Sequence, residues 1–434
     1  MANRARVIYQ SEALYAGTVD ATGHHYKVSG VGYNTNTEAE AEGDVKTGIM
    51  QLRRVQSANY SFSINRQDVN QFGQLARIDS VSIEPPSVTL DFSYYLTNGV
   101  NEKLLGFNVS GDSSALGNEI LLGQTDDAEN PGGKNFFILT TPEASDAVGN
   151  DNLDSTDNSV IALGNGFVTN YSIEAAVGGM PTASVTIEGL NLRSYNGTQD
   201  LNIPAINTTF GHEIDGVEFS LPPAVSGKGE AAIGSDNIWG SADDVWQGND
   251  EGYGDEGIAC LRPGDISMSL GTNGRAGGFE NLPYSEPTSD YDDGTAHIQS
   301  FSIDLPIGRS VIQRLGNPYG YARVVDFPVN MSVSVSAILS DLKEANVADM
   351  LFDQEEHDLV FTMREPTQSG NGPIALQYTV KGARLDGESF SSSIGDNKTV
   401  DLTFTAQVGG PEDEENGIFI SGSRNALTIT GELA

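Results

Sequence analysis

The feature that most constrains the fold of this chain is an order of motifs that occurs twice. In each copy a Ser-Phe-Ser-Ile tetrapeptide precedes an arginine with a glycine seven residues further on, and an Ala-Arg pair, a proline and a strand-like run follow. These motifs stand at 61–64, Arg66, Gly73 and Arg77 in the first copy and at 300–303, Arg309, Gly316 and Arg323 in the second. A repeat of this length predicts two copies of one folding unit. A molecule that presents similar surfaces twice is better suited to assembly than to catalysis.

Alternating polarity after each motif predicts a mainly β protein. Residues 87–96 and 331–337 both alternate between apolar and polar side chains. A strand with this period packs one face against a core and exposes the other face to water. The polar faces of the two strands would be formed by Ser87, Thr89, Asp91, Ser93, Ser332, Ser334 and Ser336. The 50 glycines of the chain fit short strands joined by turns.

Both copies continue with the same order of expected elements. A short helix follows each alternating strand, at 98–105 and at 340–351. Further strands are expected at 136–143, 166–175, 183–192 and 201–203 in the first copy and at 359–366, 374–383, 398–408 and 417–420 in the second. Lead-in strands are expected at 13–19 and 264–270. These positions divide the chain into a first β module at 1–205, an insert at 206–257 and a second β module at 258–434.

The insert is acidic and has no counterpart in either copy. Residues 231–257 contain seven acidic residues and no basic one, together with both tryptophans of the chain. The oxygen-bearing side chains that could bind a hard cation such as calcium are Asp236, Asn237, Asp243 and Asp244. The regular spacing of an EF-hand loop is missing. We therefore interpret the segment as a solvated acidic loop, with a calcium site as the alternative.

Composition excludes several classes of function. The 60 acidic and 23 basic residues give a net charge of −37, which disfavours tight binding to nucleic acid. The lone cysteine, Cys260, cannot form an intramolecular disulfide and is too few for a cysteine-based zinc site. No stretch of about 18 apolar residues and no apolar signal segment occurs. We expect neither export by a signal peptide nor a membrane span.

Motifs of known enzymes are missing from the chain. No Gly-x-Ser-x-Gly elbow, phosphate-binding loop or glycine-rich dinucleotide turn occurs. Paired carboxylates at 290–293 and 412–415 would suit glycoside hydrolysis, but with 60 acidic residues such proximity carries little information. The sequence predicts a protein that is not an enzyme, with no catalytic residues and no cofactor.

The order of strand, arginine-containing loop with a glycine seven residues on, strand after a proline, and short helix resembles the tail tube (major tail) proteins of long-tailed bacteriophages. This resemblance implies two tandem tail-tube-like β-sandwich or partial-barrel modules, each with a short flanking helix and a long loop, plus the acidic insert. In most members six one-unit subunits close a ring around the DNA passage. Two units in one chain imply a homotrimer with a pseudo-hexameric ring.

The resemblance also implies roles for the residues named above. Stacked rings would form the tube of the virion tail, assembled in the host cytoplasm and joined to other tail proteins. Viral DNA would pass without specific binding along a lumen lined by the polar faces at 87–96 and 331–337. The four matched arginines would contact an adjacent ring or subunit, or pair locally within their own module; these are Arg66, Arg77, Arg309 and Arg323. The insert would bridge the two modules or decorate the outside of the tube.

Two alternatives remain open at the level of sequence. A tail initiator, distal tail or neck protein with the same fold would form a ring but would not polymerise. A calcium-dependent carbohydrate-binding β-sandwich of the cell surface would bind glycans instead, although the lack of a signal peptide argues against it.

Overall fold

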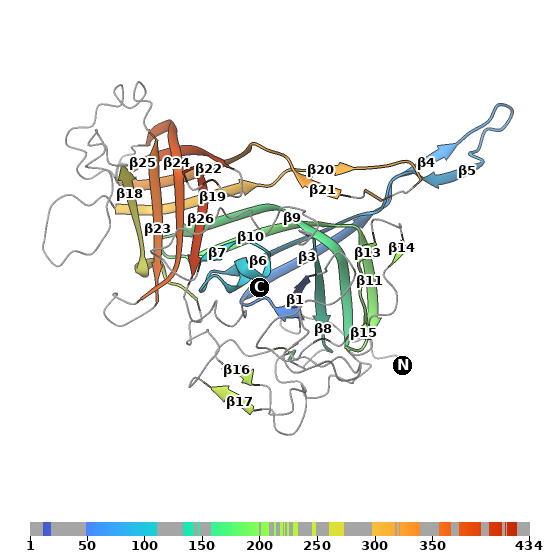
Figure 1. The fold of residues 1–434 in the computed structure, drawn as a ribbon, viewed down its shortest axis with the longest axis horizontal. Coiled ribbons are helices and arrows are strands. Elements are labelled where there is room, and N and C mark those ends of the chain that lie inside the picture. The colour runs from blue at the N-terminus through green and yellow to red at the C-terminus, as the bar shows by residue number, and fades with distance from the viewer. Residues whose placement is uncertain are drawn as a thin grey trace, which may run out of the picture.

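The computed structural model confirms the predicted mainly β class, with large antiparallel sheets (Figure 1). The residues that it describes are 12–18, 49–110, 133–142, 146–147, 158–198, 201–207, 212–213, 218–219, 221, 224, 229–232, 245–248, 260–272, 297–316, 319–320, 322–338, 356–365, 373–391, 399–409, 413 and 415–422. Among these residues, the strand pairings are antiparallel except for the parallel pairing of β26 (Gly417–Gly422) with β7 (Val109–Ser110).

A central sheet of eight neighbouring strands draws on both halves of the chain. Its first four strands, in spatial order, are β3 (Val55–Ser63), β6 (Ser87–Tyr95), β10 (Thr182–Gly189) and β9 (Ser159–Ala176). The next four are β19 (His297–Pro306), β22 (Val329–Ile338), β25 (Thr399–Val408) and β24 (Ile374–Ser391). The two sets join where β9 pairs with β19. Alternation in β6 and β22 produces the predicted packing, because their apolar residues are buried on one face.

Two of these strands also belong to outer sheets. The first half of β9 pairs with β8 (Lys134–Thr140) and β11 (Asn191–Asn196), and β8 pairs with β1 (Glu12–Thr18), which pairs with β2 (Ile49–Gln51). The first half of β24 pairs with β23 (His357–Arg364) and β26, and β23 pairs with β18 (Ile266–Thr272). Both strands are 18 residues long, longer than the sequence predicted, because each spans two sheets.

The core consists of two clusters of buried side chains. The larger one lies between the central and outer sheets and contains residues of both halves, from Leu14 to Ile420. The smaller one lies on the other face of β8, where Phe137 and Leu139 pack with Leu221 and Ala224. Residues from beyond position 205 therefore complete this smaller cluster. Because the two clusters cover opposite faces of β8, this strand is buried along its whole length.

Two hairpins extend from the same side of the molecule (Figure 1). The first consists of β4 (Arg66–Val69) and β5 (Asp79–Ser82), and the second of β20 (Arg309–Ile312) and β21 (Ala322–Val325). Each hairpin links two neighbouring strands of the central sheet, β3 with β6 and β19 with β22. Smaller ladders pair β12 (Leu201–Asn202) with β15 (Glu218–Phe219), β13 (Ile206–Asn207) with β14 (His212–Glu213), and β16 (Gly229–Ala232) with β17 (Val245–Gly248).

One predicted helix is present, and one lies outside the described residues. The helix expected at 98–105 is α1 (Val100–Leu104), which follows Gly99 in the left-handed conformation. The segment 340–351 lies outside the described residues, as do all four proposed calcium ligands, Asp236, Asn237, Asp243 and Asp244. A 3-10 turn, η3 (Pro263–Asp265), precedes β18.

Two details of the predicted alignment between the copies are wrong. Ser61 lies opposite Thr89 at the start of β6, whereas Ser300 lies opposite Ser336 at the end of β22, so the two tetrapeptides do not occupy matching positions. The strand that pairs with β9 where β26 pairs with β24 is β11, not the expected 201–203. Short tetrapeptides and apolar runs recur easily in a chain rich in Ser, so they were weak markers of register.

Candidate functional site: the polar sheet face and the two hairpins

The predicted polar residues of β6 and β22 lie on one face of the central sheet. Ser87, Asp91 and Ser334 are exposed, and the other four are partly exposed: Thr89, Ser93, Ser332 and Ser336. The apolar residues between them are buried. We name this surface the polar face.

Strand register aligns hydroxyl groups across the polar face. One row crosses seven strands, each residue opposite the next, and runs Ser57, Ser93, Ser184, Ser172, Asp304, Ser332 and Thr405. Six of the seven side chains in this row are hydroxyls and the seventh is a carboxylate. Residues that the sequence placed on separate strands are thus brought into one continuous surface.

Cross-strand hydrogen bonds hold several of these hydroxyls in place. The Oγ atoms of Ser57 and Ser93 are 2.8 Å apart, and Ser61 Oγ lies 2.6 Å from Thr89 Oγ1. Thr186 Oγ1 donates a hydrogen bond of 2.8 Å to Asp91 Oδ1. Because hydroxyls both donate and accept, the two serine and threonine pairs satisfy one another without a charged partner, whereas Thr186 bonds to a carboxylate.

The charge of the polar face is of one sign along most of its strands. Strands β3, β6, β10, β19, β22 and β25 contain no lysine or arginine. Exposed carboxylates on this face come from Asp91, Glu174, Asp304 and Asp401. The surface therefore repels anions and has few groups that could hold a phosphate.

The four predicted arginines are placed by the hairpins in three different environments. Arg66 begins β4 and is exposed, and its side chain makes no hydrogen bond or ion pair to a described residue. Arg77 lies just before β5 and donates from Nη1 to Asp68 Oδ1 at 2.9 Å, a local and exposed ion pair. Arg309 and Arg323 instead attach the second hairpin to strands of the first half.

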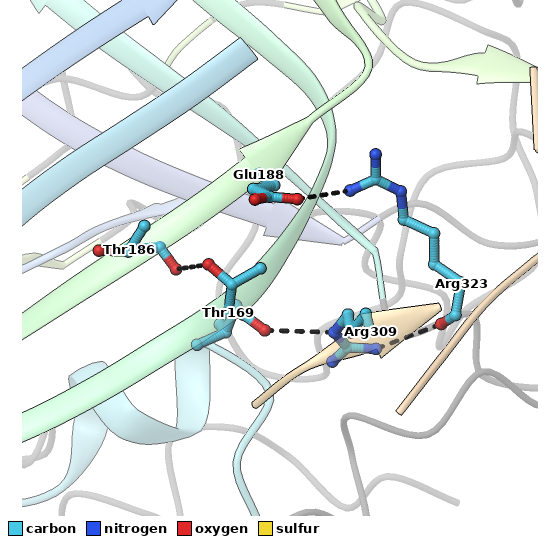
Figure 2. Close-up of polar contacts among 6 residues, drawn as sticks. Thr169, Thr186, Glu188, Arg309 and Arg323 are labelled. Atoms are coloured by element: carbon cyan, nitrogen blue, oxygen red, sulfur yellow. Dashed lines mark hydrogen bonds and ion pairs between the residues drawn. The ribbon is translucent and has the colours of Figure 1, made fainter. Parts of the chain in front are cut away.

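Figure 2 shows these two arginines beside β9 and β10. Arg309 donates from Nε to the carbonyl of Val168 at 3.2 Å and from Nη1 to the carbonyl of Arg323 at 3.3 Å. Arg323 Nη1 lies 3.4 Å from Glu188 Oε2. Both guanidinium groups lie over the ring of Phe167, at 5.0 and 5.7 Å from its centroid. Burial lowers the pKa of Arg323, while Glu188 opposes that change.

The expected equivalence of Arg77 and Arg323 is therefore wrong. Arg323 lies within β21, opposite Val311, whereas Arg77 precedes β5. Arg66 and Arg309 do match, since each begins the first strand of its hairpin. Of the expected roles, local pairing describes Arg77. Arg309 and Arg323 make contacts within the chain that cross from the second half to the first.

Exposed apolar residues at the hairpin turns were not singled out from the sequence. Phe72 and Leu75 in the first turn and Leu315 in the second are fully exposed. Phe72 and Leu315 each precede a glycine with positive φ, Gly73 at 88° and Gly316 at 92°. A large apolar residue directly before a repeated turn glycine was the available signal. Fully exposed apolar side chains at the tips of both hairpins make these turns candidates for contact with another protein.

A buried polar network also escaped the sequence analysis. Glu102 of α1 accepts hydrogen bonds from Tyr94 Oη at 2.8 Å and Tyr171 Oη at 3.1 Å, and Tyr171 Oη lies 2.9 Å from Tyr378 Oη. Tyr378 belongs to β24, so the network crosses between the halves of the chain. Burial raises the pKa of the Glu102 carboxyl, and the tyrosine hydrogen bonds oppose that shift. These groups are far apart in sequence, which is why no local pattern marked them.

Several classes of site do not occur in the described residues. No group of three or more His, Cys, Asp or Glu side chains that could hold a metal ion is found there. None of the helices in those ranges is long and apolar enough to cross a membrane. Cys260 carries a free thiol that lies 3.6 Å from the sulfur of Met180.

The polar face and the hairpins thus combine a surface that repels anions with exposed apolar tips suited to contact with another protein. In comparisons of the sequence with known proteins, no protein-family model matches the chain and no curated protein emerges as its relative.

Proposed function

We propose that this chain is a structural virion protein, the tail tube subunit of a long-tailed bacteriophage. In this proposal two tail-tube-like modules in each chain build a trimeric, pseudo-hexameric ring, and stacked rings form the conduit for viral DNA delivery. The protein would act in the virion tail, after assembly in the host cytoplasm, and would contact other tail proteins. It would have no catalytic role.

The observation that carries this proposal is the continuous polar face. A conduit for duplex DNA needs a wet wall that does not bind phosphates, because each Lys or Arg contact with a phosphate strengthens binding through counterion release. The row from Ser57 to Thr405 supplies hydroxyls, and the exposed carboxylates repel the DNA backbone. The sheet is also wide, since eight strands of one chain contribute to it.

The recurring order of strand pairing supports the two-module part of the proposal. The pairing order is β3–β6–β10–β9 in the first half and β19–β22–β25–β24 in the second. In each half the last strand continues into an outer sheet, with β8 and β1 or with β23 and β18. In each half a hairpin joins the first two strands.

The hairpins support stacking of rings. They extend from one side of the molecule (Figure 1), and their turns expose Phe72, Leu75 and Leu315. Apolar side chains at such tips are stabilised when another ring covers them, at about 25 cal/mol per Å² of apolar surface removed from water.

Negative-stain microscopy of the purified protein tests the proposal. We expect stacked rings or tubes with a central hole wide enough for duplex DNA, about 20 Å from its groove dimensions. The double variant Phe72→Ser with Leu315→Ser should leave closed rings that no longer stack. The matched control is Val177→Ser, which also removes an exposed apolar side chain but in the turn between β9 and β10.

Three outcomes of this experiment contradict the proposal. A monomer that persists at high protein concentration excludes a ring-forming subunit. Rings that never stack under any condition identify an initiator, distal tail or neck ring instead. Tight retention of duplex DNA by the assembled protein would contradict a non-binding conduit.

A further inference from the structure

We propose that the free edge of β3 pairs with the C-terminal part of β24 of a second copy of this chain, in the register that β19 and β9 adopt within one chain. We call this contact the seam. The inference rests on the proposed self-assembly and adds to it the partner surface and the register. It starts from the two ends of the central sheet, since β3 pairs with β6 alone and residues 384–391 of β24 pair with β25 alone among the described strands.

Bulges establish which residues of β3 and β19 correspond. The register of β3 against β6 shifts between Val55 and Ser57, and that of β19 against β22 shifts between Ile298 and Ser300. The extra residue is glutamine in both strands, Gln56 and Gln299. A bulge is a specific local feature, so it marks the alignment more reliably than a tetrapeptide does. Ser57 therefore corresponds to Ser300, and Ser61 corresponds to Asp304.

The same argument aligns β9 with β24. The register of β9 against β10 shifts between Val168 and Asn170, and Val168 lies opposite Ile187. The register of β24 against β25 shifts between Leu385 and Gly387, and Leu385 lies opposite Phe404. Val168 thus corresponds to Leu385, and Ser172 corresponds to Ser389.

Exposure differs sharply between corresponding positions of β3 and β19. Tyr60 is 45% exposed and Phe62 is 50% exposed, whereas their counterparts Ile303 and Leu305 are each 0% exposed. The next position is isoleucine in both copies, and Ile64 is 38% exposed while Ile307 is 0% exposed. The second-half residues are buried because β19 lies against β9 and the sheet continues on that side. Tyr60, Phe62 and Ile64 lie on the corresponding side of the sheet, but no described strand pairs with β3 at its other edge.

The occupant that fits this uncovered face is a second copy of the chain. The chain already buries the same positions of β19 by pairing with β9, and β24 offers the strand that corresponds to β9. Each chain has one β3 edge and one β24 edge, so the contact is head to tail and can repeat from chain to chain. It also pairs two sheet edges that would otherwise be open to indiscriminate association.

The register follows from the pairs seen within the chain. Asp304 lies opposite Ser172, Ile303 opposite Ile173 and Ser302 opposite Glu174. The corresponding seam pairs place Ser61 opposite Ser389, Tyr60 opposite Phe390 and Asn59 opposite Ser391 of the second copy.

Arg66 gains a partner in this arrangement. Its counterpart Arg309 donates to the carbonyl of Val168, next to the bulge of β9. Val168 corresponds to Leu385, so Arg66 would donate to the Leu385 carbonyl of the second copy. This accounts for an exposed arginine at the base of the first hairpin.

Disulfide trapping tests the seam. In a Cys260→Ala background, Ser61→Cys with Ser389→Cys should form disulfides between chains under mild oxidation. Non-reducing gels should then show covalent dimers and trimers in place of most of the monomer. The matched internal control is Ser172→Cys with Asp304→Cys, which should form a disulfide within one chain.

A register control uses Ser63→Cys with Ser391→Cys. In the proposed register Ser63 lies opposite Gly387, so these thiols are separated by four residues along the strand, about 13 Å. This pair should remain reduced under the same conditions. Tyr60→Ser with Phe62→Ser should weaken self-association at least about 100-fold, because two large apolar side chains leave the contact, while the thermal midpoint of the monomer should shift little.

The outcomes separate the seam from the proposed function. If rings are seen in the microscope but no disulfide forms between the cysteines introduced at positions 61 and 389, the seam is wrong and the tube proposal stands. If the disulfide forms but the subunits assemble only into linear oligomers that never close into rings, the seam is supported and the tube proposal is contradicted. Efficient crosslinking of the register control overturns the register. If Tyr60→Ser with Phe62→Ser unfolds the monomer, the face is covered from within the chain and the seam is wrong.

Discussion

At the scale of single residues, the most informative group is the buried network of one carboxyl and three tyrosines. Tyr378 comes from the second half of the chain, and it reaches Glu102 through Tyr171 of the first half. The network therefore joins the halves through directional bonds, in addition to their shared apolar core. Buried polar groups with satisfied hydrogen bonds favour one arrangement of the elements that carry them, because misplacing them leaves polar atoms unpaired.

We predict that Tyr378→Phe lowers the free energy of unfolding by about 1 kcal/mol, the typical net contribution of one hydrogen bond. The ring is kept, so the packing changes little. Urea denaturation measures the difference, and Tyr95→Phe on the polar side of β6 is the control. An unchanged unfolding midpoint for Tyr378→Phe would show that the hydroxyl contributes nothing to joining the halves.

The buried side chain of Lys134 should make the stability of the protein depend on pH. Burial lowers the pKa of its ammonium group to about 8, from 10.5 in the unfolded chain. The folded state thus binds fewer protons than the unfolded state between about pH 8 and 10.5, and stability rises with pH across that range. Below pH 8 the buried charge costs on the order of 3 kcal/mol, because each pKa unit corresponds to about 1.4 kcal/mol.

Lys134→Met removes that cost. We expect the variant to be more stable than the parent at pH 7 and the advantage to shrink as the pH approaches 10.5. Urea denaturation at several pH values from 6 to 10.5 checks this. If the free energies of unfolding of the two proteins change in parallel with pH, the ammonium group is not desolvated in the folded state.

At the scale of elements, β9 shows how one strand serves two sheets. The strand changes sheet at Gly164, Asn165 and Gly166, and Asn165 has a positive φ of 51°. The Asn165 amide group is bound at both ends by the backbone of Ile206, which donates to Oδ1 at 2.6 Å and accepts from Nδ2 at 3.1 Å. Asparagine tolerates this conformation better than most residues, since its short polar side chain bonds nearby backbone.

Gly164→Ala tests this bend. A Cβ at that position would lie 2.2 Å from the carbonyl oxygen of Pro204, so either the backbone must shift or the strand must move. We predict a loss of about 1–3 kcal/mol of stability, as expected for overpacking. Gly387→Ala in β24 is the matched control, because a Cβ there meets nothing within 4 Å. Equal effects of the two substitutions would contradict a packing role for Gly164.

The sequence predicted strands far better than it predicted register. Alternation in β6 and β22 marked their buried and wet faces, because the side-chain period of a strand is local. Register depends on bulges at Gln56 and Gln299, which no propensity indicates, so the tetrapeptides at 61–64 and 300–303 were aligned wrongly. Likewise, Arg323 was matched to Arg77 by order alone, although its contact with Glu188 crosses from one half of the chain to the other.

At the scale of the whole molecule, the polar face depends on the joining of β9 to β19. Each half supplies four of its strands, and without that pairing the row would be interrupted between Ser172 and Asp304. The candidate site could be predicted residue by residue in β6 and β22. The extent of the site across the other strands could not be predicted, because strands far apart in sequence meet only through the shared core.

The large net negative charge should make self-association depend on salt. Copies that each carry a charge of −37 repel one another, and salt screens that repulsion as the Debye length falls from about 10 Å at 0.1 M to about 3 Å at 1 M. The proposed contacts, at the hairpin tips and the seam, are mainly apolar and backbone contacts. We therefore expect the association constant to rise on the order of tenfold between 0.1 and 1 M NaCl, measured by sedimentation velocity.

Contacts dominated by arginine–carboxylate pairs would instead weaken with salt, because screening reduces their attraction, and that result would contradict the proposed contacts. Tyr60→Ser with Phe62→Ser is the reference, since its residual association should gain from salt in proportion while remaining weaker at every concentration.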